Sequence, residues 1–115
     1  MRRTLLKSKL HRAVVTTADL DYEGSLGLDE DLMEAADLLP YEKVHIYNVT
    51  NGERFSTYVI KESPGSGKVS VYGAAAHKAQ AGDILIIVAY VQLEDEEIEF
   101  HIPKVVILDD LNRPK

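Results

Sequence analysis

The dipeptide Asn51-Gly52 lies between two runs rich in β-branched and aromatic residues, Val44–Thr50 and Phe55–Ile60. Both residues of such a pair accept positive φ angles, as a type I′ turn requires. The sequence therefore predicts a two-residue β-hairpin, and such a turn determines the register of its strands. The residues expected to lie opposite one another are Thr50 and Glu53, Val49 and Arg54, Tyr47 and Ser56, and His45 and Tyr58.

Side chains alternate between the two faces of a strand, so this hairpin has one more apolar face and one polar face. The polar face gathers a guanidinium, phenols and an imidazole on one surface, which makes it a candidate site. The apolar face holds Ile46, Phe55, Thr57 and Val59, and the polar face holds His45, Tyr47, Arg54, Ser56 and Tyr58.

Most other segments also have the pattern of short strands, namely Leu10–Thr17, Lys68–Val71 and Val105–Leu108. The near-continuous apolar run Ile84–Val91 is typical of a strand buried on both faces.

One helix is predicted over Glu30–Leu38, with Asp29 as its N-cap and Leu28 and Met33 as a hydrophobic staple. A shorter helical turn is expected over Ala74–Ala79. Many strands with one or two short helices in 115 residues predict a single, mainly β domain spanning 1–115, either a small barrel or an α+β fold.

Charge and composition exclude several classes of function. Lys and Arg number 13 against 19 Asp and Glu, and a net charge of −6 argues against a nucleic-acid or anionic-membrane partner. No apolar run approaches the ~18 residues of a membrane span. The absence of cysteine excludes disulfides and thiolate metal sites and fits a reducing cytoplasm. The four histidines are scattered without paired spacing, so no metal site is expected.

Two glycine-containing segments resemble functional loops. Pro64–Lys68 lacks the spacing of a phosphate-binding loop, so a turn between strands is expected there. Gly24-Ser25-Leu26-Gly27 has the pattern of a turn before the predicted helix. It is also a place where the Ser25 hydroxyl can attack the preceding carbonyl, because glycine permits backbone distortion and leaves that carbonyl unobstructed.

A set of short motifs spans residues 3–91, in this order: Leu10-His11-Arg12, Ala18-Asp19-Leu20, Tyr22-Glu23-Gly24-Ser25, Asn48-Val49-Thr50-Asn51-Gly52, Arg54-Phe55-Ser56-Thr57-Tyr58, Gly73-Ala74-Ala75-Ala76-His77 and Gly82-Asp83. Their order and spacing resemble the aspartate 1-decarboxylase family, pyruvoyl-dependent enzymes that form β-alanine for pantothenate synthesis. Because several separate motifs agree at once, the resemblance is specific.

The resemblance implies a double-ψ β-barrel in a cytoplasmic homotetramer, with active sites at the subunit interfaces. It also implies autocatalytic cleavage between Gly24 and Ser25, which divides the chain into residues 1–24 and 25–115. Ser25 then becomes an N-terminal pyruvoyl group, the only cofactor, and no metal is needed. A maturation factor is the one further partner that the resemblance leaves open.

The resemblance further implies roles for individual residues in cleavage and catalysis. The pyruvoyl group at position 25 forms a Schiff base with L-aspartate and accepts the electrons released on decarboxylation. Tyr58 donates a proton to the resulting carbanion, and Thr57 stabilises the oxyanion formed during cleavage at Gly24. The hairpin register places Thr57 on the face opposite Arg54 and Tyr58.

Substrate binding is implied for a second group of residues. Arg54 and Lys9 would bind carboxylates, supported by His11, and the pocket would be lined by Gly73, Ala74 and Ala75.

Three residues depart from the commonest family pattern. Leu26 stands where Cys is frequent, Tyr47 where Trp is common and Tyr72 where Asn is common. The changes at Tyr47 and Tyr72, both expected to line the pocket, leave open a second substrate such as L-glutamate. A non-enzymatic reading also stays open, in which the chain is an uncleaved β-barrel interaction module.

Overall fold

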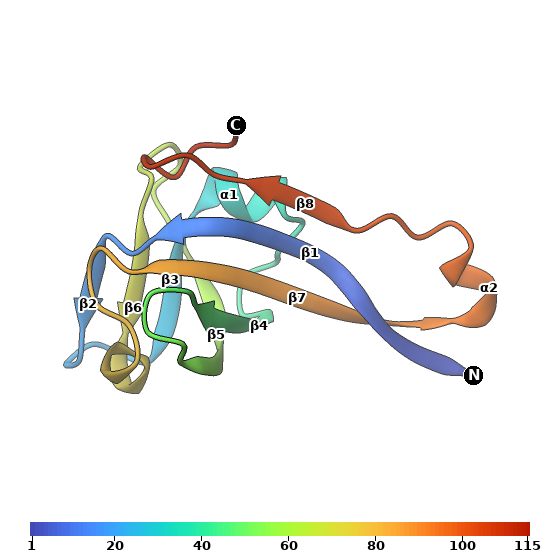
Figure 1. Cartoon of the computed structure of the whole chain (residues 1–115), viewed down its shortest axis with the longest axis horizontal. Coiled ribbons are helices and arrows are strands. Elements are labelled where there is room, and N and C mark those ends of the chain that lie inside the picture. The colour runs from blue at the N-terminus through green and yellow to red at the C-terminus, as the bar shows by residue number, and fades with distance from the viewer.

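Two long paired strands, β1 and β7, run through the molecule and project beyond its compact end (Figure 1). The computed structural model describes residues 1–115 and measures 44 × 27 × 24 Å. Its elements are β1 (Arg2–Val14), β2 (Thr17–Asp19), β3 (Ser25–Asp29), α1 (Glu30–Ala35), β4 (Lys43–Asn48), β5 (Arg54–Glu62), β6 (Val69–Tyr72), the 3₁₀ helix η1 (Gly73–His77), β7 (Ile84–Glu94), α2 (Asp95–Ile98) and β8 (Lys104–Ile107).

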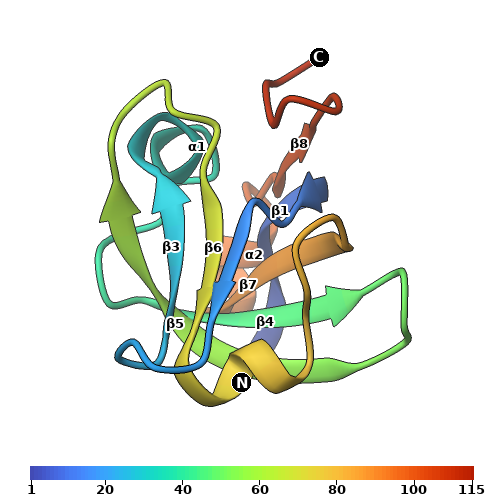
Figure 2. The same ribbon diagram turned by 90° about the vertical axis from the view of Figure 1, so that its left-hand side faces the viewer.

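All eight strands form one mixed sheet, in the order β2-β6-β3-β5-β4-β7-β1-β8. The pairs β1–β8, β2–β6 and β3–β5 are parallel, and the other neighbours are antiparallel. The sheet curls, so that β4 and β7 cross behind β3, β5 and β6 when the molecule is viewed from its compact end (Figure 2). The prediction of a mainly β, barrel-like fold with short helices is confirmed.

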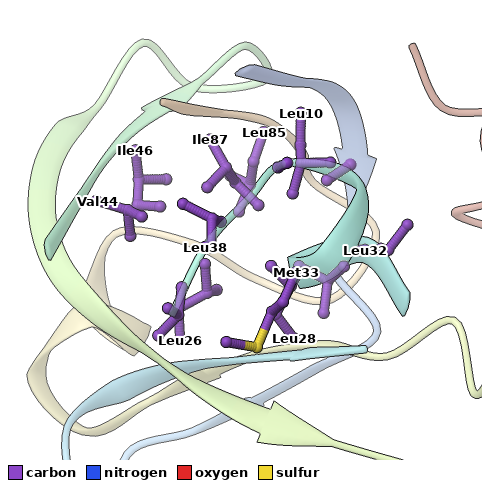
Figure 3. Packing of buried hydrophobic residues seen from close by; sticks show 14 of the residues in the cluster. Leu10, Leu26, Leu28, Leu32, Met33, Leu38, Val44, Ile46, Leu85 and Ile87 are labelled. Carbon is purple, nitrogen blue, oxygen red and sulfur yellow. The ribbon is translucent and has the colours of Figure 1, made fainter. Parts of the chain in front are cut away.

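The core lies inside this curl. Leu10 of β1, Ile87 of β7 and Ile46 of β4 occupy one row across three neighbouring strands, and all three are buried (Figure 3). Leu28 from β3 and Met33 from α1 approach them from the other side. Burying a side chain of this size contributes about 1.5–3 kcal/mol, so the alternation along β1, β4 and β7 decides which face of the sheet turns inward.

Asp29 links α1 to the loop between β5 and β6. Its carboxylate accepts the N–H of Asp31, which confirms the predicted N-cap, and also accepts the N–H groups of Gly65 and Gly67. The N–H groups of the Pro64–Lys68 segment therefore donate to a buried side chain, and the expectation of a turn between strands there is confirmed.

Membrane-spanning helices are absent, because each helix of the chain is too short and too polar for that role.

The predicted hairpin exists, but its two-residue turn and register are wrong. Tyr47 pairs with Arg54 and His45 with Ser56, so the loop has four residues between Asn48 and Glu53. The Asn48 side chain accepts the N–H groups of Thr50 and Asn51, which favours the longer turn. Because the register is shifted by two residues, an even number, the predicted faces of both strands are retained.

Several element boundaries differ from the predictions. The first strand begins at Arg2 and ends at Val14, because its basic residues pair with the far end of β7 outside the core. The helix ends at Ala35 instead of Leu38. The predicted helical turn near Ala74 is the 3₁₀ helix η1. The acidic segment after Glu94 is the short helix α2, which begins with a capping box formed by Glu94 and Glu97.

Two strand predictions were wrong in a way that affects the site. Ser25–Asp29 is a fully buried strand, not a turn before the helix, because it lies between β5 and β6. The run from Ile84 is not buried throughout: Tyr90 is 41% exposed, and β7 continues to Glu94.

Candidate active site

The outward face of the sheet carries two rows of aligned side chains. One row runs across β1, β7, β4 and β5 as His11, Ile86, Tyr47 and Arg54. The next runs as Lys9, Val88, His45 and Ser56. With Tyr58 and Tyr90, two residues further along their strands, these residues form a surface called here the polar sheet face: Lys9, His11, His45, Tyr47, Arg54, Ser56, Tyr58 and Tyr90.

Arg54 is held over an aromatic ring on this face. Its Cζ lies 4.2 Å from the centroid of the Tyr47 ring. The Tyr47 hydroxyl shares a hydrogen bond of 2.8 Å with the Tyr90 hydroxyl, and the ring of His45 meets the ring of Tyr90 edge-on at 5.2 Å. The hydrogen bond with Tyr47, and then burial, raise the pKa of Tyr90 above its ordinary value of 10.

The charged groups on the polar sheet face are not neutralised within the chain. Arg54 and Lys9 form no ion pair, whereas the neighbouring Lys7 binds Glu42 at 2.8 Å. Arg54, His45 and Tyr47 line a hollow of about 250 Å³. A guanidinium and an ammonium with no internal partner are free to meet carboxylates of a ligand.

His11 contributes a buried nitrogen to the same face. Its Nδ1 has no hydrogen-bond partner in the chain. Burial, followed by the charges of Lys9 and Arg12, lowers the pKa of His11 below its ordinary value of 6.5. The imidazole is therefore neutral near pH 7, with one unsatisfied polar atom.

A second cluster surrounds the Gly24-Ser25 bond. Ser25, the first residue of β3, is 2% exposed, and its hydroxyl donates to the carbonyl of Glu23 at 3.3 Å. Gly73 packs directly on this bond: with φ +70°, a Cβ at position 73 would lie 2.5 Å from the Gly24 Cα. Gly24 itself does not have a left-handed φ, so the residue that must be glycine on steric grounds is Gly73.

Gly24 opens onto a hollow of about 280 Å³, called here the Gly24 pocket. Thr57 reaches it from the face of β5 opposite Arg54, which confirms the predicted face of Thr57. Its lining is Gly24, Phe55, Ser56, Thr57, Tyr72, Ala74, Ala75 and Lys78.

Tyr72 forms one wall of the Gly24 pocket and is fixed in place. Its hydroxyl donates to Glu62 at 2.6 Å, and its ring lies 4.6 Å from the ring of Tyr22. The side chains of Tyr72 and Glu62 lie directly over Gly27, where an added Cβ would meet both of them. Burial and the hydrogen bond to Glu62 raise the pKa of Tyr72 above its ordinary value of 10.

The predicted site residues therefore fall into two groups. Lys9, His11, Tyr47, Arg54 and Tyr58 belong to the polar sheet face. The other group consists of Gly24, Ser25, Thr57, Tyr72, Gly73, Ala74 and Ala75, which lie at or around the Gly24 pocket. Within the polar sheet face itself, Lys9 on β1 and Arg54 on β5 are three strand spacings apart. At about 4.8 Å per spacing, their backbones are roughly 14 Å apart.

Three residues in these surroundings were missed by the sequence analysis. Tyr90 lies in an apolar run, but it is the one side chain there with a polar group, which could have indicated an outward position. Glu62 and Lys78 carry no comparable signal, because their proximity to the Gly24 pocket depends on how β5 and η1 fold against it. No group of three or more His, Asp or Glu residues is arranged to hold a metal ion.

The chain is thus small and mainly β, with unpaired cations on one face of its sheet and a Gly-Ser bond at the edge of a separate pocket. The family model described as aspartate decarboxylase matches residues 1–115. Aspartate 1-decarboxylase from Ralstonia pickettii is 57% identical over the whole chain and 96% of its own length. The proteins of that name from Ralstonia nicotianae and Bordetella pertussis are 58% and 55% identical over the whole chain, covering 96% and 94% of their own lengths.

The chain belongs to the aspartate decarboxylase family. It is therefore an enzyme of the carboxy-lyase class.

Proposed function

We propose that this chain decarboxylates L-aspartate to β-alanine and CO₂, after cleaving itself between Gly24 and Ser25. The observation that carries the proposal is the Gly24-Ser25 bond, which joins an exposed Gly24 at the edge of the Gly24 pocket to a buried Ser25 and is packed on Gly73. Relatives named aspartate 1-decarboxylase support the substrate. The β-alanine would serve pantothenate synthesis in the cytoplasm.

Cleavage begins with the Ser25 hydroxyl. Its oxygen attacks the Gly24 carbonyl carbon, the peptide C–N bond breaks and an ester forms in its place. Thr57, in the same pocket, is placed to stabilise the oxyanion of this step. Loss of the Ser25 Cα proton then breaks the Cβ–O bond, releasing the carboxylate of residues 1–24. The remaining dehydroalanine takes up water and loses ammonia, so that residue 25 becomes a pyruvoyl group.

The surroundings of Ser25 fit a pyruvoyl group. Gly73 leaves no Cβ over the bond to be broken, and the small Ala74 and Ala75 line the adjoining pocket. A ketone conjugated to an amide supplies an electron sink for decarboxylation of an amino acid bound there. A maturation factor that assists cleavage is compatible with this arrangement, and no metal is required.

The polar sheet face supplies the groups that bind and protonate. Arg54 would bind one carboxylate in a bidentate pair, and Lys9 is a second cation for the other. His11 lies next to these cations on the same face and would support the binding as a neutral polar side chain. Tyr58, 39% exposed on this face, would deliver the proton that replaces the departing carboxylate.

The two groups of side chains line separate hollows that adjoin at Phe55 and Ser56. Arg54 and Thr57 project from opposite faces of β5, and the polar sheet face is open. A complete site forms if the polar sheet face of one chain covers the Gly24 pocket of another. This arrangement supports active sites at subunit interfaces, and the family resemblance adds that the proposed assembly is a homotetramer.

Two measurements test the proposed function. Intact mass of the denatured protein should give residues 1–24 and residues 25–115, the latter lighter than its serine form by one ammonia. Release of CO₂ from L-aspartate, in competition with L-glutamate, then measures substrate choice. Cleaved protein that releases no CO₂ from L-aspartate would contradict the substrate, and an uncleaved chain would favour the interaction module.

A further inference from the structure

We propose that Tyr90 is a positioning residue for substrate. Its hydrogen bond to the Tyr47 hydroxyl fixes the Tyr47 ring, and the Arg54 guanidinium packs on the face of that ring. The inference deepens the proposed function and rests on it, because Arg54 is taken there as the carboxylate-binding group. None of the motifs identified in the sequence includes Tyr90.

The first step of the argument is the freedom of Arg54. Its side chain is exposed and forms neither an ion pair nor a hydrogen bond within the chain. A long flexible side chain loses rotamer freedom when it binds a ligand, and that loss weakens binding. The face of the Tyr47 ring, 4.2 Å away, is the contact that restricts Arg54 before a ligand arrives.

The second step is what restricts Tyr47 itself. Its ring borders the open hollow beside Arg54 and is only half-buried. The hydrogen bond between the Tyr47 and Tyr90 hydroxyls fixes the far end of the ring. Tyr90 is in turn held by the edge of His45, from the strand between β7 and β5. The chain of contacts therefore runs from His45 through Tyr90 and Tyr47 to Arg54.

The third step is the position of Tyr90 relative to the reacting atoms. On the polar sheet face Tyr90 contacts Tyr47, and Tyr47 contacts Arg54, so Tyr90 is one residue removed from the group proposed to bind substrate. Its hydroxyl is already engaged by Tyr47. Tyr90 should therefore affect how well carboxylates bind at Arg54, and leave the rates of chain cleavage and of the chemical step unchanged.

The experiment compares Tyr90→Phe with the wild type as the processed, full assembly. The KM for L-aspartate should rise about three- to ten-fold, the loss of one hydrogen bond, with kcat within about two-fold of wild type. The dissociation constant of succinate, measured by titration calorimetry, should rise by the same factor. Tyr47→Phe should behave likewise, and the double variant should bind no more weakly than either single variant.

Tyr41→Phe is the matched control, since Tyr41 is 76% exposed and its hydroxyl makes no hydrogen bond within the chain. It should bind succinate as the wild type does. Unchanged succinate affinity in Tyr90→Phe would overturn the inference, as would losses that add in the double variant. A fall in kcat with unchanged KM would also overturn it. Wild type that fails to bind succinate overturns it too.

Failure of the proposed function has a different signature. Wild-type protein that binds succinate but releases no CO₂ from L-aspartate contradicts the proposed reaction. The effect of Tyr90→Phe on succinate affinity would still decide whether Tyr90 positions Arg54.

Discussion

At the scale of single residues, Gly73 is the most constrained position near the candidate site. Its φ of +70° is costly for any residue with a Cβ, and that Cβ would lie 2.5 Å from Gly24. Gly82 offers a comparison, because its φ is +93° but no atom lies within 4 Å of an added Cβ. Replacing Gly82 by alanine therefore tests the free-energy cost of a positive φ alone, whereas replacing Gly73 adds the cost of a steric clash with Gly24.

Gly73→Ala should lower the free energy of unfolding by more than about 2 kcal/mol and slow or stop cleavage at Gly24. Gly82→Ala should lose only about 1 kcal/mol and still be cleaved. Denaturant unfolding and intact mass measure the two effects. Equal behaviour of the two variants would show that the contact between Gly73 and Gly24 is unimportant.

His11 gives stability a dependence on pH. Burial, with Lys9 and Arg12, lowers its pKa in the folded chain below the ordinary value of 6.5. As pH falls through about 6.5, the unfolded chain therefore takes up a proton before the folded chain does, and stability decreases. Above that pH both forms are neutral and the effect disappears.

Replacement of His11 by Asn should flatten this dependence. Thermal unfolding followed from pH 8 to pH 5 should show the wild type losing more stability at the acid end than His11→Asn. His77→Asn, at an exposed position in η1, should keep the wild-type profile. A His11→Asn curve parallel to that of the wild type would argue against this role of His11.

At the scale of elements, the loop between β4 and β5 depends on the buried side chain of Asn48. It accepts two N–H groups of the loop and donates to the Lys78 carbonyl and to Asp83. The same side chain thus joins the hairpin that carries Arg54 to the segment after η1. Asn51 also donates to the Lys78 carbonyl, but it is exposed.

Asn48→Ala should lower the free energy of unfolding by about 2–3 kcal/mol, because it leaves buried groups without partners. Asn51→Ala should cost less than about 1 kcal/mol, since water can replace an exposed bond. Chemical denaturation measures both. If the two losses were similar, Asn48 would not be the residue that organises the loop.

At the scale of the whole molecule, the separation of the two clusters makes assembly part of the proposed site. Arg54→Ala damages the polar sheet face, and Ser25→Ala removes the residue to be converted near the Gly24 pocket. Each variant alone should be inactive. If one chain supplies each half of a site, co-assembly of the two inactive variants should restore about one quarter of the sites.

A control pair distinguishes complementation from instability. Arg54→Ala and Lys9→Ala both alter the polar sheet face, so mixing them should restore no activity beyond their sum. Decarboxylation assays on co-expressed chains provide the measurement. No recovery with Ser25→Ala plus Arg54→Ala would mean that each chain holds a complete site.

The sequence alone determined the faces of the hairpin and the cap of α1. Alternation along Val44–Thr50 and Phe55–Ile60 placed Arg54 and Tyr58 together and Thr57 on the other side, and this survived a wrong register because the error was two residues. Asp29 was recognisable as a cap because an N-cap is a local interaction. The motifs around Gly24, Arg54 and Gly73 also led to the family.

Only the tertiary structure decided which distant segments meet. The loop at Asn51-Gly52 is longer than the predicted two-residue turn because the Asn48 side chain forms hydrogen bonds with the loop and also with Lys78 and Asp83, which lie outside the hairpin. Ser25 begins a buried strand because β5 and β6 flank it. The pairs Tyr47–Tyr90 and Glu62–Tyr72 likewise depend on how separate strands align. Local patterns determine which face a residue occupies, whereas long-range pairing determines its neighbours.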